Sequence, residues 1–177
     1  MLLYKTGLIQ NYLMKYRFAI MILLSAVVMF SCNSKKKEAG SKYKNNILLG
    51  SKGFKIKEAF LAFNDSSRLA DDNNVNIGQH VNLIILVDSG WNAEDGKIYP
   101  GVGQKVETND GTHIFEKTDL MESHAGGIPA EDGSRVTVQA VINTADKEYD
   151  YFLVSFRVWD KKSENEITGS YKLHVKL

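Results

Sequence analysis

Apolar and polar residues take turns along much of this 177-residue chain, and this alternation restricts the fold more than any other property of the sequence. Near the C-terminus, apolar residues occupy every second position: Tyr171, Leu173, Val175 and Leu177. A period of two places successive side chains on opposite faces of a β-strand, whereas a helix repeats its apolar residues every three or four positions. Residues 170–177 are therefore predicted to form a strand with one buried face.

Several other segments show the same period. In residues 81–87 both faces are largely apolar, because Ile84 and Leu86 lie on the face opposite Val81, Leu83, Ile85 and Val87. This strand is therefore expected to be central and buried on both sides. The phase of the alternation changes within residues 54–63, which predicts a β-bulge near Glu58. Further strands are expected at residues 46–49, 98–107, 112–116, 135–143 and 152–158.

Turn signals separate these strands. Three Asp-Gly pairs fit tight reversals of the chain: Asp95-Gly96, Asp110-Gly111 and Asp132-Gly133. Beyond residue 32, no window of ten residues has a convincing helical period. About eight short strands predict an all-β fold, a single antiparallel β-sandwich of immunoglobulin-like type, with a barrel as the alternative. Ile114 is expected to face the core, and Trp159 is expected to form an aromatic rim against it.

The N-terminal segment has a different character. Lys15 and Arg17 precede an apolar run over residues 18–30, and Ser31 leads directly into Cys32, the only cysteine of the chain. The run is too short to span a bilayer as a relaxed helix. An uncleaved signal anchor and a buried core helix are the alternatives, and the polar residues on both sides of the run speak against a core helix.

This pattern resembles a bacterial lipoprotein signal peptide, and the resemblance covers residues 1–32, with Met14 as an alternative start. It implies cleavage before Cys32, attachment of diacylglycerol to its thiol and acylation of the new amino terminus. The chain then divides into three parts: a signal peptide over residues 1–31, the lipidated cysteine with a polar, Lys-rich tether over 32–44, and a β-sandwich domain over 45–177.

A cysteine that carries lipid would attach the protein to a membrane, because two or more acyl chains hold firmly whereas one gives marginal binding. The expected location is the bacterial cell envelope. Asn33 follows the cysteine, where an aspartate would resemble the inner-membrane retention signal of enteric lipoproteins, so the outer membrane is expected. Since Cys32 is the only cysteine, the folded domain can contain no disulfide.

The charge of the chain excludes one class of partner. The full sequence has 22 basic and 21 acidic residues, and the leader contains three of the basic ones, Lys5, Lys15 and Arg17, and no acidic one. The part that follows is therefore slightly acidic. Nucleic-acid binding usually needs a strongly basic face, so no nucleic-acid partner is expected.

Motifs of catalysis and cofactor binding are absent from the sequence. Residues 50–53 resemble a phosphate loop only in composition, and residues 101–103 lack the third glycine of a dinucleotide-binding loop. The four histidines show no ligand spacing: His80, His113, His124 and His174. The domain is therefore expected to be non-enzymatic and to need no cofactor, with calcium as an alternative.

Counting strand crossings predicts which loops meet at each end of a sandwich. One end should gather residues 64–76, 109–110 and 146–148, and the opposite end should gather 88–96, 117–133 and 161–166. Long loops on a rigid sandwich are where binding usually resides. The second end supplies the candidate ligand-binding residues: Asp88, Trp91, Asp95, His124 and Asp160.

Three interpretations of this end follow. Asp88, Asp95 and Asp160 could be hard oxygen ligands for calcium. Trp91 could be an exposed platform for a glycan or peptide, with His124 and the carboxylates fixing its orientation. The favoured interpretation is that Trp91 closes the open end of the core. The sequence as a whole predicts a membrane-anchored, non-enzymatic binding or assembly module; a glycan-binding accessory domain, a calcium-dependent adhesion domain and a subunit of an envelope complex are the alternatives.

Overall fold

The computed structural model describes residues 43–176. The predicted signal peptide, the lipidated Cys32, nearly all of the tether and Leu177 lie outside the described residues. Within them, no helix is both long and apolar enough to cross a membrane. The described chain is built from strands, with two short 3-10 helices, η2 (Glu122–His124) and η3 (Ala130–Ser134).

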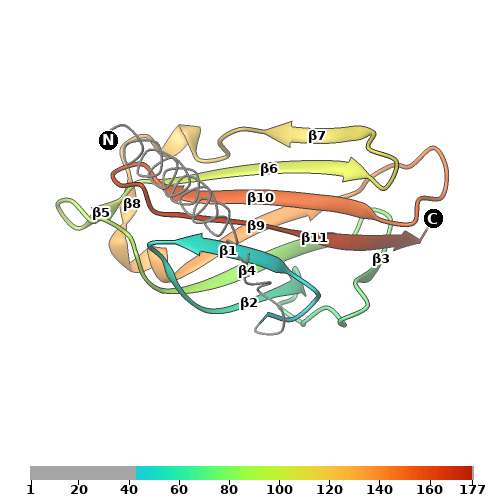
Figure 1. Ribbon diagram of the computed structural model, residues 1–177, viewed down its shortest axis with the longest axis horizontal. Coiled ribbons are helices and arrows are strands. Elements are labelled where there is room, and N and C mark those ends of the chain that lie inside the picture. Colours follow the sequence, from blue (N-terminus) through green and yellow to red (C-terminus); the bar gives the residue numbers. More distant parts are fainter. Residues whose placement is uncertain (1–42, 177) are drawn as a thin grey trace, which may run out of the picture. The chain divides into compact units, whose positions relative to one another are not determined.

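Two antiparallel sheets form the domain (Figure 1). The large sheet has the order β1 (Leu48–Lys52), β11 (Glu166–Lys176), β10 (Phe152–Asp160), β6 (Pro100–Thr108) and β7 (His113–Lys117), and β3 (Asn74–Asn76) pairs in parallel with the end of β11. The small sheet has the order β2 (Lys55–Phe63), β4 (His80–Ser89) and β9 (Arg135–Val141). A separate pair joins β5 (Lys97–Ile98) to β8 (Ile128–Pro129).

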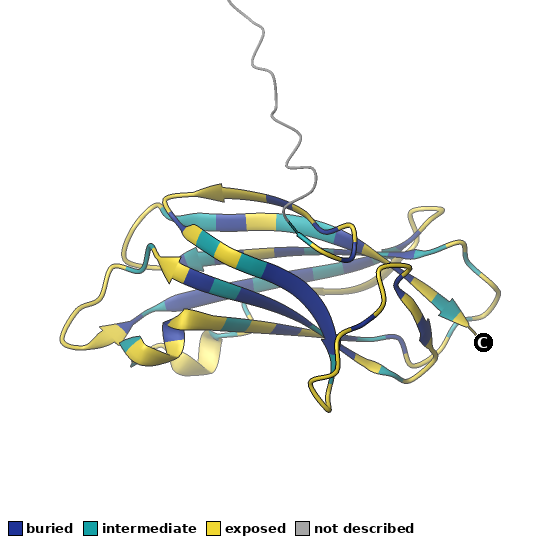
Figure 2. Cartoon of the chain, turned by 90° about the horizontal axis from the view of Figure 1, so that it is seen from below, coloured by how far each residue is buried: buried dark blue, intermediate teal, exposed yellow. Residues whose placement is uncertain are grey.

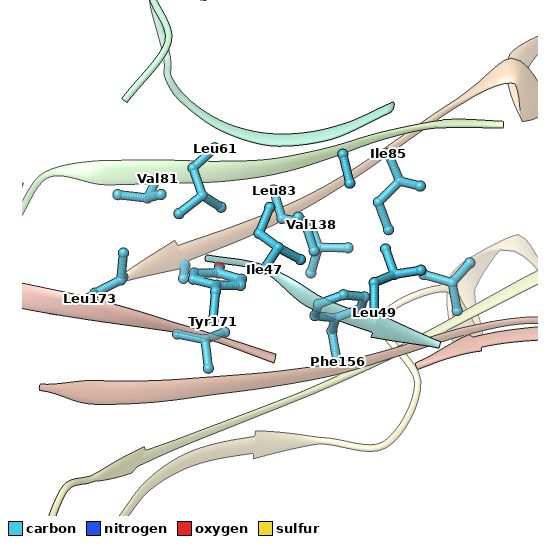
Figure 3. Close-up of a cluster of buried hydrophobic side chains, with 14 of the residues drawn as sticks. Ile47, Leu49, Leu61, Val81, Leu83, Ile85, Val138, Phe156, Tyr171 and Leu173 are labelled. Atoms are coloured by element: carbon cyan, nitrogen blue, oxygen red, sulfur yellow. The ribbon is translucent and has the colours of Figure 1, made fainter. Parts of the chain in front are cut away.

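The core lies between the two sheets. Figure 3 shows Leu83 and Ile85 of β4 facing Phe156 and Tyr171 of the large sheet, and all four side chains are buried. Along the strands, buried and exposed residues alternate (Figure 2), which is the pattern that the sequence predicted. The predicted antiparallel β-sandwich is therefore confirmed. The longer strands number eight within the described part, and the remaining three have two or three residues each.

The bulge predicted near Glu58 is also confirmed. The register between β2 and β4 shifts on both sides of Ile56, and after the shift Ala59 and Leu61 face the core. Strand β4 pairs with β2 on one side and β9 on the other, so it is the central strand of the small sheet, as its apolar faces indicated.

The prediction for Ile114 is wrong. Ile114 and its neighbour Phe115 are 43% and 42% exposed. Their strand, β7, is the last strand of the five-stranded path in the large sheet, whereas the small sheet has only three strands. The narrower sheet leaves the margin at β7 uncovered, and alternation alone could not reveal the difference in width.

The predicted grouping of the loops holds at both ends. At one end, the Lys147 ammonium pairs with Asp110 at 3.0 Å, and the amide of His174 donates to the carbonyl oxygen of Asn73. At the opposite end, the backbone amide of Asn92 donates to Asp160 at 2.8 Å. Figure 1 shows these ends at the right, near β3, and at the left, near β5 and β8.

Candidate functional site

Asp160, at the end of β10, is a structural anchor. Its side chain is only 1% exposed. One carboxylate oxygen accepts hydrogen bonds from the amide of Asn92 and the hydroxyl of Ser163, both at 2.8 Å, and the other accepts one from the amide of Lys162 at 3.0 Å. Because a buried carboxylate needs such donors, Asp160 joins the turn after β10 to the loop after β4.

Trp91 packs against the core, as the favoured interpretation predicted. Its ring meets Phe54 edge-on, with ring centroids 4.8 Å apart, and its indole N–H donates to the carbonyl oxygen of Gly133 at 2.8 Å. The side chain is half-buried and closes the loop end of the sandwich. Both of these contacts are internal to the domain.

The other predicted residues of this end lie apart at the surface. Asp88 is exposed and pairs with the Lys57 ammonium at 3.1 Å. Asp95 occupies an exposed turn with a φ of 51°, and His124 is exposed at the end of η2. Among residues 43–176, no three His, Cys, Asp or Glu side chains are grouped so that they could hold a metal ion. The structure therefore does not gather the carboxylates proposed for calcium, and of the five predicted residues it joins only Trp91 and Asp160, through the loop at Asn92.

A different surface of the domain contains a shallow hollow. On the outer face of the large sheet, which points away from β2, β4 and β9, a hollow of about 350 Å³ lies over β7, β6 and β10. Its lining includes Gly103, Lys105, Glu116, Ser155, Arg157 and Trp159. This surface is called the Trp159 hollow below.

Small residues create this hollow. Strand register places Gly103 opposite Arg157 and Lys105 opposite Ser155, so each small residue lies beside a long one. The Trp159 ring lies across Gly101, where an added Cβ would collide with its carbon atoms. Trp159 is half-buried on the outer face, between the inward Val158 and Asp160. The prediction of a rim against the core is therefore wrong, because position 159 has the outward phase of β10.

The charged groups around the Trp159 hollow are paired. The Arg157 guanidinium donates to Glu166 through Nε at 2.9 Å and Nη2 at 2.8 Å, and it lies 4.9 Å from the centre of the Trp159 ring. The Lys105 ammonium lies 2.7 Å from a carboxylate oxygen of Glu107. The Lys117 ammonium, which also lines the hollow, lies 2.8 Å from a carboxylate oxygen of Glu122. This part of the surface thus offers an aromatic ring and hydrogen-bonding groups, and each cation of its lining has a carboxylate partner.

A second hollow of about 350 Å³ lies on the same face, at the opposite end of β10 and β11. Its lining includes Leu48, Asp72, Leu153, Ser170, Lys172 and His174. We call it the Leu48 hollow. The Lys172 ammonium lies over the ring of Tyr151, 3.8 Å from its centre, and Nδ1 of His174 is 2.7 Å from the carbonyl oxygen of Asp150.

Comparison with known proteins adds the following. No protein-family model matches the chain, and no curated protein matches it. Among solved structures the chain is similar to the C-terminal domain of wzt, with 15% sequence identity and a TM-score of 0.45, over 77% of this chain and 81% of that chain. So distant a likeness says nothing about ligands.

Proposed function

We propose that this protein is a membrane-anchored, non-enzymatic module of the bacterial cell envelope that binds a neutral glycan on the outer face of its large sheet. Anchorage rests on the lipoprotein-like leader, which would place lipid on Cys32 and the protein at the outer membrane. Glycan binding rests on one observation, the hollow whose lining combines Trp159, Arg157 and a floor of small residues.

The chemistry of the Trp159 hollow fits a sugar ring. A sugar presents C–H groups on its faces and hydroxyls at its edge, so it needs apolar contact together with hydrogen bonds. The indole of Trp159 supplies the apolar surface, and Ser155 and the paired Arg157 supply polar atoms near it. Because Lys105, Lys117 and Arg157 are each paired with a carboxylate, the hollow offers no strong field that would attract a charged polymer.

The test is a binding assay with three neutral polysaccharides, mannan, galactan and dextran, and with polygalacturonate as a charged comparison. The wild-type domain should bind a neutral polymer more tightly than the charged one. Trp159→Ala should weaken that binding by about 30-fold, since truncation of a central tryptophan costs about 2 kcal/mol. Phe115→Ala, which removes an exposed aromatic on β7, is the matched control and should bind like the wild type.

Failure of all three neutral polymers to bind, or full binding by Trp159→Ala, would contradict the glycan proposal. Turnover of a bound polymer would contradict the non-enzymatic part. Anchorage has its own test, in which mass spectrometry of protein taken from bacterial membranes should find lipid on Cys32 and no leader. A free thiol with the leader still attached would overturn it.

A second candidate function is assembly with a protein partner in an envelope complex. Its support is β7, which in the described part of the chain is hydrogen-bonded only to β6 and carries the exposed Ile114 and Phe115. Unpaired strand edges can accept a strand from another chain. A photo-crosslinking residue at Phe115 should then capture a defined partner in cells, whereas the same residue at the exposed Thr137 of β9 should not.

A further inference from the structure

We propose that the Trp159 hollow and the Leu48 hollow form one continuous track, in which a single glycan chain occupies both. This inference rests on the proposed function, because it extends the same ligand class across the sheet. It adds that recognition depends on chain length and that β11 and β1 contribute a second binding region.

Strand register makes the two hollows continuous. Ser155 on β10 pairs with Lys105 on one side and with Ser170 on the other, and Ser170 pairs with Leu48. Ser155 lines the first hollow and Ser170 lines the second. The two small side chains therefore meet on the outer face, so the floor passes from one hollow to the other without a bulky residue between them.

The track has the dimensions of an extended chain. It crosses β7, β6, β10, β11 and β1, which are neighbours in the sheet. Neighbouring strands lie about 4.8 Å apart, so five strands span about 19 Å. One small ligand in either hollow would leave much of this length empty, whereas a polymer could cover it.

The Leu48 hollow offers the same kind of chemistry as the first. Leu48 is 64% exposed and, together with Leu153, provides apolar surface. Because Nδ1 of His174 donates to the carbonyl oxygen of Asp150, Nε2 is the ring nitrogen that is left to bond a hydroxyl group. Ser170 adds a second hydroxyl-binding group.

Charge is balanced here as well. The lining includes one ammonium, on Lys172, and one carboxylate, on Asp72, and the latter accepts hydrogen bonds from the backbone and side chain of Asn74. A neutral chain with alternating C–H faces and hydroxyls thus fits both hollows. A charged chain would find the cations of the first hollow already paired with carboxylates, and one charge of each sign in the second.

Two substitutions test the contribution of each hollow separately. Ser155→Ile and Ser170→Ile each place a bulky side chain on the outer face, where it fills one hollow without entering the core. Isoleucine favours strands and can neither stack like an aromatic ring nor bind hydroxyl groups. Thr137→Ile, on the exposed face of β9 in the small sheet, is the matched control.

Affinity is measured for fragments of increasing length, prepared from whichever of mannan, galactan and dextran the wild type binds. Wild-type affinity should rise by about tenfold or more between short and long fragments, as expected when a second linked region engages. Ser170→Ile should bind short fragments normally and lose the gain with length. Ser155→Ile should weaken short and long fragments alike.

The track is overturned if Ser170→Ile leaves the gain with length intact, or if wild-type affinity does not change with length; binding at the Trp159 hollow would survive either result. If no fragment binds the wild type, the proposed function itself fails. Leu48→Ser, at an exposed position, provides a second test of the same hollow and guards against misfolding of the isoleucine variant. It should reduce binding of long fragments only.

Discussion

The two ends of the sandwich are held by buried polar groups of different chemistry. Near β3 the buried groups are the amides of Asn45 and Asn73, each 2% exposed. Near β5 they are the carboxylate of Asp160, which is 1% exposed, and the partly buried carboxylate of Asp119. Both pairs satisfy backbone groups that the turns leave without partners. An amide does not titrate, however, and a carboxylate does, so the two ends should respond differently to acid.

At the amide end, Asn45 joins three parts of the chain. Its Nδ2 donates to the carbonyl oxygens of Leu69 and Ala70, at 3.1 and 3.0 Å, and its Oδ1 accepts from the amide of Leu61 at 2.9 Å. Asn73 donates to the carbonyl oxygen of Asn45 at 2.8 Å. Both asparagines have positive φ, of 59° and 54°, a conformation that asparagine tolerates better than most residues.

At the carboxylate end, Asp119 ties the long loop to the large sheet. Burial by itself would raise the pKa of Asp119, but the Lys161 ammonium at 2.6 Å and the amides of Met121 and Val102, at 2.8 and 3.2 Å, outweigh it. The pKa of this carboxyl group therefore lies below its ordinary value.

The largest effect is expected from Asn45→Ala. The substitution leaves the buried amide of Leu61 and two carbonyl oxygens without their partner and places alanine at a positive φ, so the free energy of unfolding should fall by about 3 kcal/mol. Asn46→Ala is the control, because Asn46 also has a positive φ but is exposed. Equal losses for the two variants in urea unfolding would show that the amide network contributes little.

At the other end, Asp160→Ala should lower the free energy of unfolding by about 2 kcal/mol, because two backbone amides lose a buried acceptor. Hydrogen exchange should increase at Asn92 and Lys162 and remain slow at Leu61, at the amide end. Asp95→Asn, which keeps a residue that tolerates the positive φ of this exposed turn, should change neither quantity. Faster exchange at Leu61 in the Asp160 variant would mean that the two ends are not independent.

Acid should weaken the end near β5 through the carboxylate of Asp119. A carboxyl group whose pKa is lowered by folding contributes its full stability above the unfolded value of about 3.9, and the contribution is lost as pH falls through the folded pKa. Asp110, at the amide end, also has a lowered pKa because it accepts hydrogen bonds from Thr108 and Lys147, so wild type alone cannot isolate Asp119.

The informative comparison is therefore between wild type and Asp119→Asn. Urea unfolding from pH 7 to pH 2 should show wild type more stable near pH 7, with the difference shrinking in acid. A difference that stays constant across this range would mean that ionisation of Asp119 does not stabilise the fold.

The smallest effect is expected in the middle of the core, between the two ends. The Tyr171 hydroxyl is buried and has no hydrogen-bond partner in residues 43–176, and burial raises its pKa. Tyr171→Phe removes a buried hydroxyl that is desolvated without forming a hydrogen bond, so the free energy of unfolding should rise by about 1 kcal/mol. A loss of stability would indicate that a partner for the hydroxyl exists in solution.

Alternation was sufficient to predict the sandwich, because residues such as Leu83 and Val154 reveal their face through their immediate neighbours. The loop grouping followed from counting crossings. The outer hollows could not be predicted in this way, since Ser155 and Ser170 become neighbours only through the register of β10 and β11. Trp159 could have been assigned to the outer face, however, from its phase relative to Val158.

Two of the ligand-binding residues predicted from the sequence make internal contacts in the structure. Asp160 and Trp91 were chosen because carboxylates and tryptophans in loops are often used for binding, but the same groups also satisfy turn amides and close the end of a core. Their partners, Asn92 and Gly133, are distant in sequence from Asp160 and Trp91 respectively. Sequence position alone therefore could not distinguish a ligand contact from an internal one.

Gly101 and Gly103 shape the Trp159 hollow by what they lack, because a methyl group at either position would press on the indole or on the backbone oxygen of Thr118. Mutagenesis that only truncates side chains cannot detect the contribution of these two glycines. Substitutions that add atoms at Gly101 or Gly103 should alter ligand specificity more than substitutions that shorten the neighbouring side chains. Differences in ligand specificity among natural variants should therefore arise first at these two glycines.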